Sequence, residues 1–233
     1  MRNLLLITLL VASTHVLCAN EKPTGKFLFQ PMLIWATSEV THQGTGYLLK
    51  HENHAYGVTS IHFLDFDAGG LFEAIWLDVH SSKPIAGFRT SAGKPKTTSI
   101  QKFEDIQNDF LIMPLEKIPD GCVGIEIEKV AHYSKGHKLW FPNKAEEESI
   151  GYTWVEAEIV EDKGHMMTAR LLSEVKLQGR SGSPFFSQET GKAIGMLMGG
   201  DENEIYLCPT RGIVDSLESN PTPIPLMESI TNR

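Results

Sequence analysis

The sequence is poor in cysteine, has no excess of basic residues and shows little helical periodicity. Three cysteines in 233 residues exclude a disulfide-dense fold. Acidic residues outnumber basic ones by 29 to 21, so the chain lacks an electrostatic footprint for nucleic-acid phosphates or anionic lipid. Its 20 glycines and 12 prolines are scattered rather than clustered, which excludes a disordered or collagen-like chain. We therefore expect a globular protein with a packed core and no nucleic-acid partner.

Long apolar runs are absent after the N-terminus. Residues 1–19 combine a basic start at Arg2, an apolar run over residues 4–12 and a small-residue exit at Ala19, which is the pattern of a secretory signal peptide. A membrane-spanning helix needs roughly 20 apolar residues, about twice the length of this run. We expect cleavage near Ala19, a secreted or periplasmic location and no stable membrane insertion. Lipid attachment at Cys18 is the alternative.

Only Cys122 and Cys208 follow the predicted cleavage point. An oxidising compartment permits such a pair to bridge across a long loop. Cysteines are also common as small buried apolar residues, and the sequence leaves both alternatives open.

Short runs of β-branched and aromatic residues, separated by turn signals, dominate the chain and predict an all-β fold. We expect one helix, over residues 210–219, with Thr210 as its cap. A turn at residues 116–121 contains Pro119 and Gly121 and divides the chain into two halves, which two packed barrels would fit. The predicted strands cover residues 27–35, 46–50, 55–60, 71–79, 110–115, 123–129, 138–141, 152–160, 166–171 and 193–198.

The segment Gly-Arg-Ser-Gly-Ser-Pro at residues 179–184 carries the strongest chemical signal. A serine between glycines exposes its hydroxyl, and the glycines let backbone N–H groups turn toward one point. A serine nucleophile needs a base, and the base needs an acid to hold its tautomer. All nine histidines precede Ser181, so the α/β-hydrolase order, in which histidine comes last, is excluded.

Two upstream positions supply the base and the acid. A hairpin predicted over residues 46–60 delivers His62 just past a strand end, and Asp109 stands at the mouth of an apolar strand. The order along the chain is therefore histidine, aspartate, serine. His51 and His54 suggest a metal pair, but they are three apart in a predicted hairpin turn rather than four apart on a helix, so we predict no metal site.

With Val-Thr-Ser-Ile-His at residues 58–62, Asp-Phe-Leu-Ile-Met at 109–113 and Gly-x-Ser-Gly-Ser-Pro at 179–184, the chain resembles chymotrypsin-fold serine proteases. The motifs are closest to the bacterial glutamyl-endopeptidase and Deg/HtrA branches, and the likeness covers about residues 27–215. It implies two packed six-stranded antiparallel β-barrels with a C-terminal helix. The implied division is a signal peptide at 1–19, an N-terminal barrel at 20–118, a C-terminal barrel at 119–215, and a helix end and proline-rich tail at 216–233.

The resemblance also implies roles for single residues. Ser181 would attack the peptide carbonyl, His62 would act as general base and then general acid, and Asp109 would orient His62. The N–H groups of Gly179 and Ser181 would form the oxyanion hole. Gly199 and the strand before it would pair with the substrate backbone.

Specificity and activation depart from parts of the family. The pocket floor would be Val175 and its wall Leu197; neither is charged, so we expect a small or apolar side chain rather than a basic or acidic one. Members activated by insertion of a new N-terminus carry aspartate where this chain has Arg180, and no Ile-Val-Gly-Gly start is present. We therefore do not expect activation by N-terminal insertion.

These features predict a secreted, monomeric serine endopeptidase that acts on proteins or peptides without a cofactor or metal. Two alternatives remain. One is a protease-fold protein that binds a partner without cleaving it, and the other is a serine esterase with the same triad.

Overall fold

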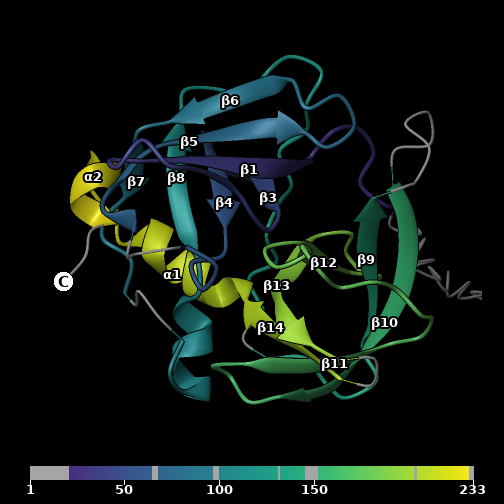
Figure 1. Cartoon of the computed structure of the whole chain (residues 1–233). Coiled ribbons are helices and arrows are strands. Elements are labelled where there is room, and N and C mark those ends of the chain that lie inside the picture. The colour runs from purple at the N-terminus through teal and green to yellow at the C-terminus, as the bar shows by residue number, and fades with distance from the viewer. Residues whose placement is uncertain are drawn as a thin grey trace, which may run out of the picture.

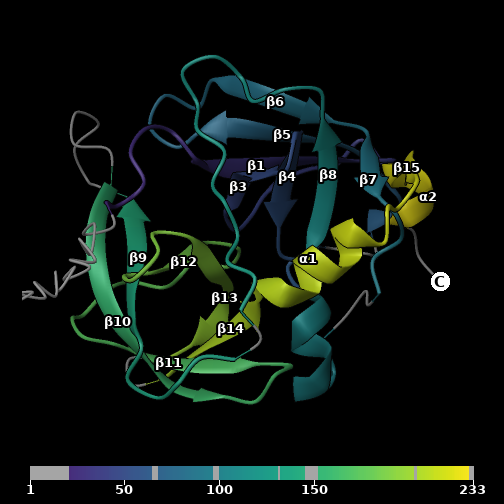
Figure 2. The same cartoon turned by 180° about the vertical axis from the view of Figure 1, so that it is seen from behind.

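The computed structural model describes residues 21–64, 68–96, 100–130, 132–144, 152–201 and 204–230. Most of its strands form two groups, β1–β6 with β8 and β9–β14, and helix α1 runs beside both (Figures 1 and 2). The predicted all-β architecture with a C-terminal helix is confirmed. The predicted signal peptide, including Cys18, lies outside the described residues. Among the described residues, no helix is long and apolar enough to span a membrane.

The first group is a curled antiparallel sheet with the strand order β6-β5-β1-β3-β4-β8, and β2 pairs with β1 as a seventh strand. Within the described residues, hydrogen bonds do not close this sheet into a ring between β6 and β8. Its strands are β1 (Leu28–Trp35), β2 (Val40–His42), β3 (Gly46–His51), β4 (His54–Thr59), β5 (Leu71–Asp78), β6 (Pro84–Phe88) and β8 (Leu111–Leu115).

The second group is a closed six-stranded barrel with the order β10-β11-β14-β13-β12-β9. Along β10 the side chains of Val155, Ala157 and Ile159 are buried at every second position, as the period of two in a half-buried strand requires. The strands are β9 (Lys138–Lys144), β10 (Tyr152–Asp162), β11 (Met167–Leu171), β12 (Pro184–Ser187), β13 (Ala193–Gly200) and β14 (Ile205–Pro209).

Three apolar cores stabilise this arrangement. One lies inside the first sheet and one inside the closed barrel. The third joins the halves, because it packs Phe27 and Tyr47 of the N-terminal half against Phe186 and Met196 of the barrel. The two halves therefore meet through a continuous apolar interface.

Helix α1 (Thr210–Glu218) confirms the predicted helix, with Ile213, Val214 and Leu217 on its buried face. The predicted cap at Thr210 is wrong. Pro209 occupies the cap position, and the Thr210 hydroxyl donates to the Ile194 carbonyl at 2.9 Å. This buried hydroxyl finds its acceptor in the neighbouring strand rather than in its own helix.

The chain after α1 returns to the N-terminal half. Strand β15 (Pro223–Pro225) pairs with β7 (Thr90–Ala92), and helix α2 (Leu226–Ser229) follows. Leu226 and Ile230 are fully buried in the core of the first sheet. The predicted proline-rich tail is thus a packed part of the fold.

The strand prediction over residues 123–129 is wrong. These residues form only isolated bridges, because they pair in turn with Leu49 on one side and Ala193 on the other. A 3-10 helix, η2 (Phe103–Asn108), and the short strands β2, β6, β7, β12, β14 and β15 were not predicted. Strands this short show few alternations, although β8 and β11, with five residues each, were predicted.

The two described cysteines do not form a disulfide. Cys122 is half-buried beside the core of the first sheet, whereas Cys208 is fully buried in the core between the halves. Of the two alternatives, the structure shows separate free thiols.

Candidate active site

The β3–β4 hairpin positions the first candidate residue. Gly46 pairs with Thr59 at its open end, and the turn between His51 and His54 lies at the other end. The chain leaves β4 at Thr59 and reaches His62 three residues later. Ile61, directly before it, is fully buried in the core of the first sheet, so the backbone at His62 is anchored by packing.

The structure brings His62 and Asp109 together. The His62 Nδ1 atom lies 2.8 Å from the Asp109 Oδ2 atom. The other carboxylate oxygen accepts hydrogen bonds from the N–H groups of Ile61 at 2.9 Å and His62 at 2.8 Å. Asp109 is fully buried, whereas 24% of the His62 side chain is exposed. Asp109 thus holds the ring by one nitrogen and leaves Nε2 on the more exposed side to take a proton.

Asp109 follows η2 and precedes β8. Its N–H donates to the Ile106 carbonyl at 3.1 Å, at the end of the 3-10 helix. The carboxylate is therefore placed by a local turn as well as by its bonds to residues 61 and 62.

The serine lies on a tight loop before β12. Arg180 N–H donates to the Leu177 carbonyl at 2.9 Å, and Ser183 N–H donates to the Arg180 carbonyl at 2.9 Å. Within the described residues, no carbonyl accepts a hydrogen bond from the N–H of Gly179 or Ser181. Those two donors are the ones that the sequence predicted for the oxyanion hole, and they remain available to a ligand.

The Ser181 hydroxyl forms no hydrogen bond to His62 in the described part of the chain. It donates to the carbonyl of Met198 in β13 at 3.0 Å. Catalytic hydrogen bonds are often long or unformed before substrate binds, and a rotation about the Cα–Cβ bond is enough to redirect a serine hydroxyl.

Arg180 has an unusual environment for a charged side chain. Its guanidinium Nε is buried and has no hydrogen-bond partner among the described residues. Burial lowers the pKa of the guanidinium. The loop around the serine therefore carries a partly desolvated cation, and no ion pair of Arg180 orders the loop within the described chain.

The predicted specificity residues lie in three different settings. Val175 is half-buried and lines a surface cavity of about 530 Å³ formed by residues 171–176. Leu197 is 1% exposed and packs inside the barrel core. A Cβ added to Gly199 would meet no atom within 4 Å, so space beside this part of β13 is open. Their roles in substrate binding stay predictions.

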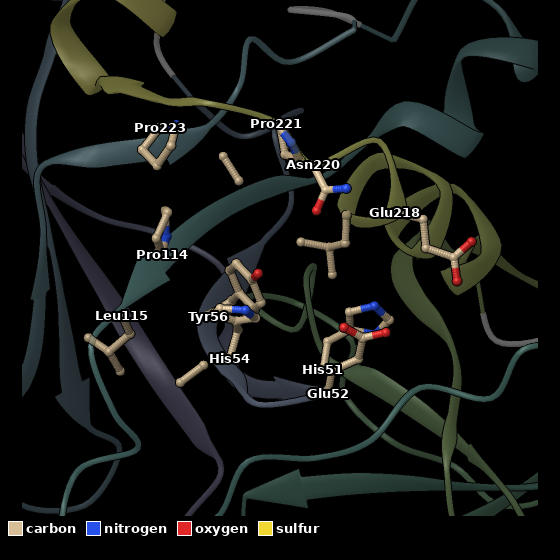
Figure 3. Close-up of a pocket in the computed structure, with 13 residues that line it drawn as sticks. His51, Glu52, His54, Tyr56, Pro114, Leu115, Glu218, Asn220, Pro221 and Pro223 are labelled. Carbon is tan, nitrogen blue, oxygen red and sulfur yellow. The ribbon is translucent and has the colours of Figure 1, made fainter.

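A second cavity of about 480 Å³ lies at the far end of the same hairpin (Figure 3). His51, Glu52, His54 and Tyr56 line one side, and residues 217–223 line another. The described residues contain no cluster of three or more side chains arranged to hold a metal ion. The cavity is separated from His62 by the length of β4.

Two residues at the site were not found from the sequence. Met198 contributes its carbonyl, so its side chain gave no signal. Thr45 contributes its N–H and hydroxyl across the boundary between the halves. The short Gly-Thr-Gly segment before β3 was its only signal, and that segment also reads as an ordinary turn into a strand.

No protein-family model and no curated protein matches this sequence. Among solved structures, GrC, a granzyme, is similar with a TM-score of 0.55 and 10% identity, over 83% of this chain and 92% of that chain. The HtrA-type protease AlgW, in a serine-to-alanine variant with a tripeptide, gives a TM-score of 0.53 and 13% identity. This second match covers 84% of this chain, which spans 60% of that chain's length. The protein therefore has the chymotrypsin-like serine protease fold.

Proposed function

We propose that this protein is a secreted serine endopeptidase that cleaves peptide bonds through an acyl-enzyme. The observation that carries the proposal is the pair of His62 and Asp109, joined at 2.8 Å with the carboxylate fully buried. Such a pair fixes the tautomer of the histidine and stabilises its protonated form, which is what activation of a serine requires. The similarity of the fold to two solved protease structures supports the proposal independently.

The proposed reaction uses these residues in turn. The Ser181 Oγ attacks the substrate carbonyl while its proton passes to His62 Nε2, and the negative charge forms on the carbonyl oxygen. The N–H groups of Gly179 and Ser181 stabilise that oxyanion. The intermediate then collapses, His62 returns the proton to the leaving amine, and an ester to Ser181 remains. A water molecule, deprotonated by His62, hydrolyses the ester and regenerates the enzyme.

The substrate is proposed to be a protein or peptide that lies along β13. Gly199 and Gly200 end this strand, and the open space beside Gly199 leaves room for an added backbone. The uncharged Val175 and Leu197 favour a small or apolar side chain at the cleaved bond. We also propose a monomer in a secreted or periplasmic location, related to the glutamyl-endopeptidase and Deg/HtrA branches.

The alternatives draw on two observations. The bond from Ser181 Oγ to Met198, and an Arg180 Nε that has no partner among the described residues, favour a binding protein that has lost activity. A serine esterase would use the same groups on a different acyl compound. We prefer the endopeptidase because the buried carboxylate and both open N–H groups are in place.

A fluorophosphonate probe, which reacts with activated serines, tests the proposal. The purified mature chain should be labelled at Ser181, and the variants Ser181→Ala and His62→Ala should not be labelled. Ser134→Ala is the matched control, because Ser134 is an exposed serine on the turn before β9, and it should label normally. A folded wild-type chain that stays unlabelled would support the binding protein.

A peptide library separates the remaining alternatives. We expect cleavage after small or apolar residues. The variants that are labelled by the probe should cleave the library, and those that are not labelled should not. Cleavage predominantly after arginine, lysine or glutamate would contradict the proposed pocket. Labelling combined with hydrolysis of simple esters but of no peptide would favour the esterase.

A further inference from the structure

Thr45 contacts the serine loop from the opposite half of the protein. It lies directly before β3 and is 5% exposed. Its N–H donates to the Ser181 carbonyl at 2.7 Å, and its hydroxyl donates to the Gly179 carbonyl at 3.1 Å. Its own carbonyl accepts a hydrogen bond from the Thr59 hydroxyl at 2.9 Å. One residue of the N-terminal half thus holds two carbonyls of the loop and is itself held by β4.

These bonds fix two peptide groups of the loop at both ends. The Gly179 carbonyl is held by Thr45, and the N–H of the same peptide, which belongs to Arg180, donates to Leu177. The Ser181 carbonyl is also held by Thr45, and the N–H of that peptide, on Gly182, donates to the Leu197 carbonyl at 2.8 Å. A peptide group is planar, so holding its two ends sets its orientation.

With these two peptide groups held, the N–H groups of Gly179 and Ser181 stay free for an oxyanion. The peptide between them has its carbonyl, on Arg180, bonded to the N–H of Ser183. Its own N–H, on Ser181, has no carbonyl partner among the described residues, and neither has the N–H of Gly179. Rotation of the Gly179–Arg180 peptide would break both bonds that hold it.

The close approach of Thr45 depends on a glycine. A Cβ built on Gly182 would lie 2.0 Å from the Thr45 carbonyl oxygen, and the φ angle of Gly182 is +93°. Only glycine satisfies both the space and the backbone angle. The contact between Thr45 and the loop is therefore part of the fold and not an incidental side-chain bond.

We propose that Thr45 is a positioning residue that keeps the oxyanion hole formed by holding the Gly179 and Ser181 carbonyls. This inference rests on the proposed function. It explains how the loop is ordered although Arg180 forms no ion pair within the described chain. It also implies that the site is formed without a newly cleaved N-terminus, so addition of residues to the mature N-terminus leaves the rate unchanged.

The test compares Thr45→Val with Thr45→Ser. Valine keeps the shape of threonine but removes the donor to Gly179, whereas serine keeps the donor. For Thr45→Val we expect kcat on a peptide substrate to fall about 10- to 100-fold, because a direct oxyanion donor is worth about 100- to 1,000-fold and Thr45 acts through one. KM should change by less than about threefold, and Thr45→Ser should restore kcat to within about fivefold of wild type.

Thr210→Val is the matched control, because it removes a buried threonine hydroxyl that also donates to a strand carbonyl, at the other end of β13. It should keep kcat near the wild-type value. A Thr45→Val protein whose kcat stays within twofold of wild type overturns the proposal. So does a Thr45→Ser protein that is as slow as Thr45→Val.

Hydrogen exchange of the backbone amides separates this proposal from the proposed function. If the Thr45 hydroxyl holds the Gly179–Arg180 peptide, the Arg180 amide should exchange at least about 10-fold faster in Thr45→Val than in wild type, with unchanged exchange in β9–β11. This holds for a chain that proves to be inactive, in which case the proposed function fails alone. Unchanged exchange at the Arg180 amide overturns the role of Thr45.

Discussion

Asp109 is the residue whose surroundings are most completely determined. Three hydrogen bonds reach its two oxygens, from the N–H groups of Ile61 and His62 and from the His62 ring. The first two anchor the carboxylate, so the third is directed at one nitrogen of His62. The effect of a substitution at Asp109 on activity therefore depends on which of these three bonds it keeps.

Asp109→Asn should lower kcat by about 1,000- to 10,000-fold while the protein stays folded. The amide oxygen can still accept from the two backbone N–H groups, but its NH₂ then faces His62 Nδ1 and selects the tautomer that cannot accept the serine proton. Steady-state kinetics together with thermal unfolding test this. A variant that unfolds, or one that keeps more than a tenth of the activity, contradicts it.

Arg180→Met should stabilise the protein by about 1 kcal/mol. The substitution removes a buried Nε that has no partner among the described residues, and methionine retains most of the apolar volume of the side chain. Urea unfolding at neutral pH measures the change. A loss of stability would mean that the guanidinium has a stabilising contact.

At the scale of elements, the end of β5 is tied to the segment that precedes β1. The Lys26 Nζ atom lies 2.6 Å from Asp78 Oδ2, and the N–H of Ser81 donates to Asp78 Oδ1 at 2.8 Å. Burial alone would raise the pKa of Asp78, but the bonds from Lys26 and Ser81 outweigh it and hold the pKa well below its usual range. The first and fifth strands are thus joined by a charge as well as by their ladder.

Acid should weaken this tie. The folded pKa of Asp78 is lowered, so its contribution to stability is complete above the unfolded value of about 4 and is lost as the pH falls through the folded value. Wild type should therefore exceed Asp78→Asn in stability at pH 7, and the difference should shrink at pH 3. Urea unfolding of both proteins at the two pH values checks it. An equal difference at pH 3 and pH 7 would contradict the role of Asp78.

At the scale of the whole molecule, the candidate site exists only because the two halves pack together. His62 and Asp109 come from the first sheet, and Ser181 comes from the barrel. Thr45 joins them by hydrogen bonds, and the core around Tyr47 and Phe186 joins them by apolar burial. Separation of the halves would therefore abolish the site without changing either strand pattern.

The same packing keeps the two described cysteines apart. Burial raises the pKa of the Cys208 thiol well above its usual value, so this thiol should resist alkylation in the native protein. Cys122 is half-buried and should react faster. In denaturant without reductant, mass spectrometry should find both thiols alkylated in the mature chain. A mass about 2 Da lower that rises on reduction would instead show a disulfide.

Some strands and the chemical motifs were predictable because their signals are local. Residues 152–160 alternate along one strand, and the Gly-x-Ser-Gly-Ser-Pro segment is contiguous, so both can be read from neighbours in the chain. The short strands β12 and β14 were not predicted. Both are strands because they pair with β13, and four or five residues carry too little local pattern to show that pairing.

The all-β class, the helix at the C-terminal end and the order of histidine, aspartate and serine could all be predicted from residue type and spacing along the chain. The bond from Thr45 to Gly179 and the return of the tail onto β7 could be seen only in the folded molecule. The same holds for the separation of Cys122 and Cys208. These three outcomes depend on which atoms far apart in the sequence come within bonding or hydrogen-bond distance. That is set by the packing of two halves around a shared core.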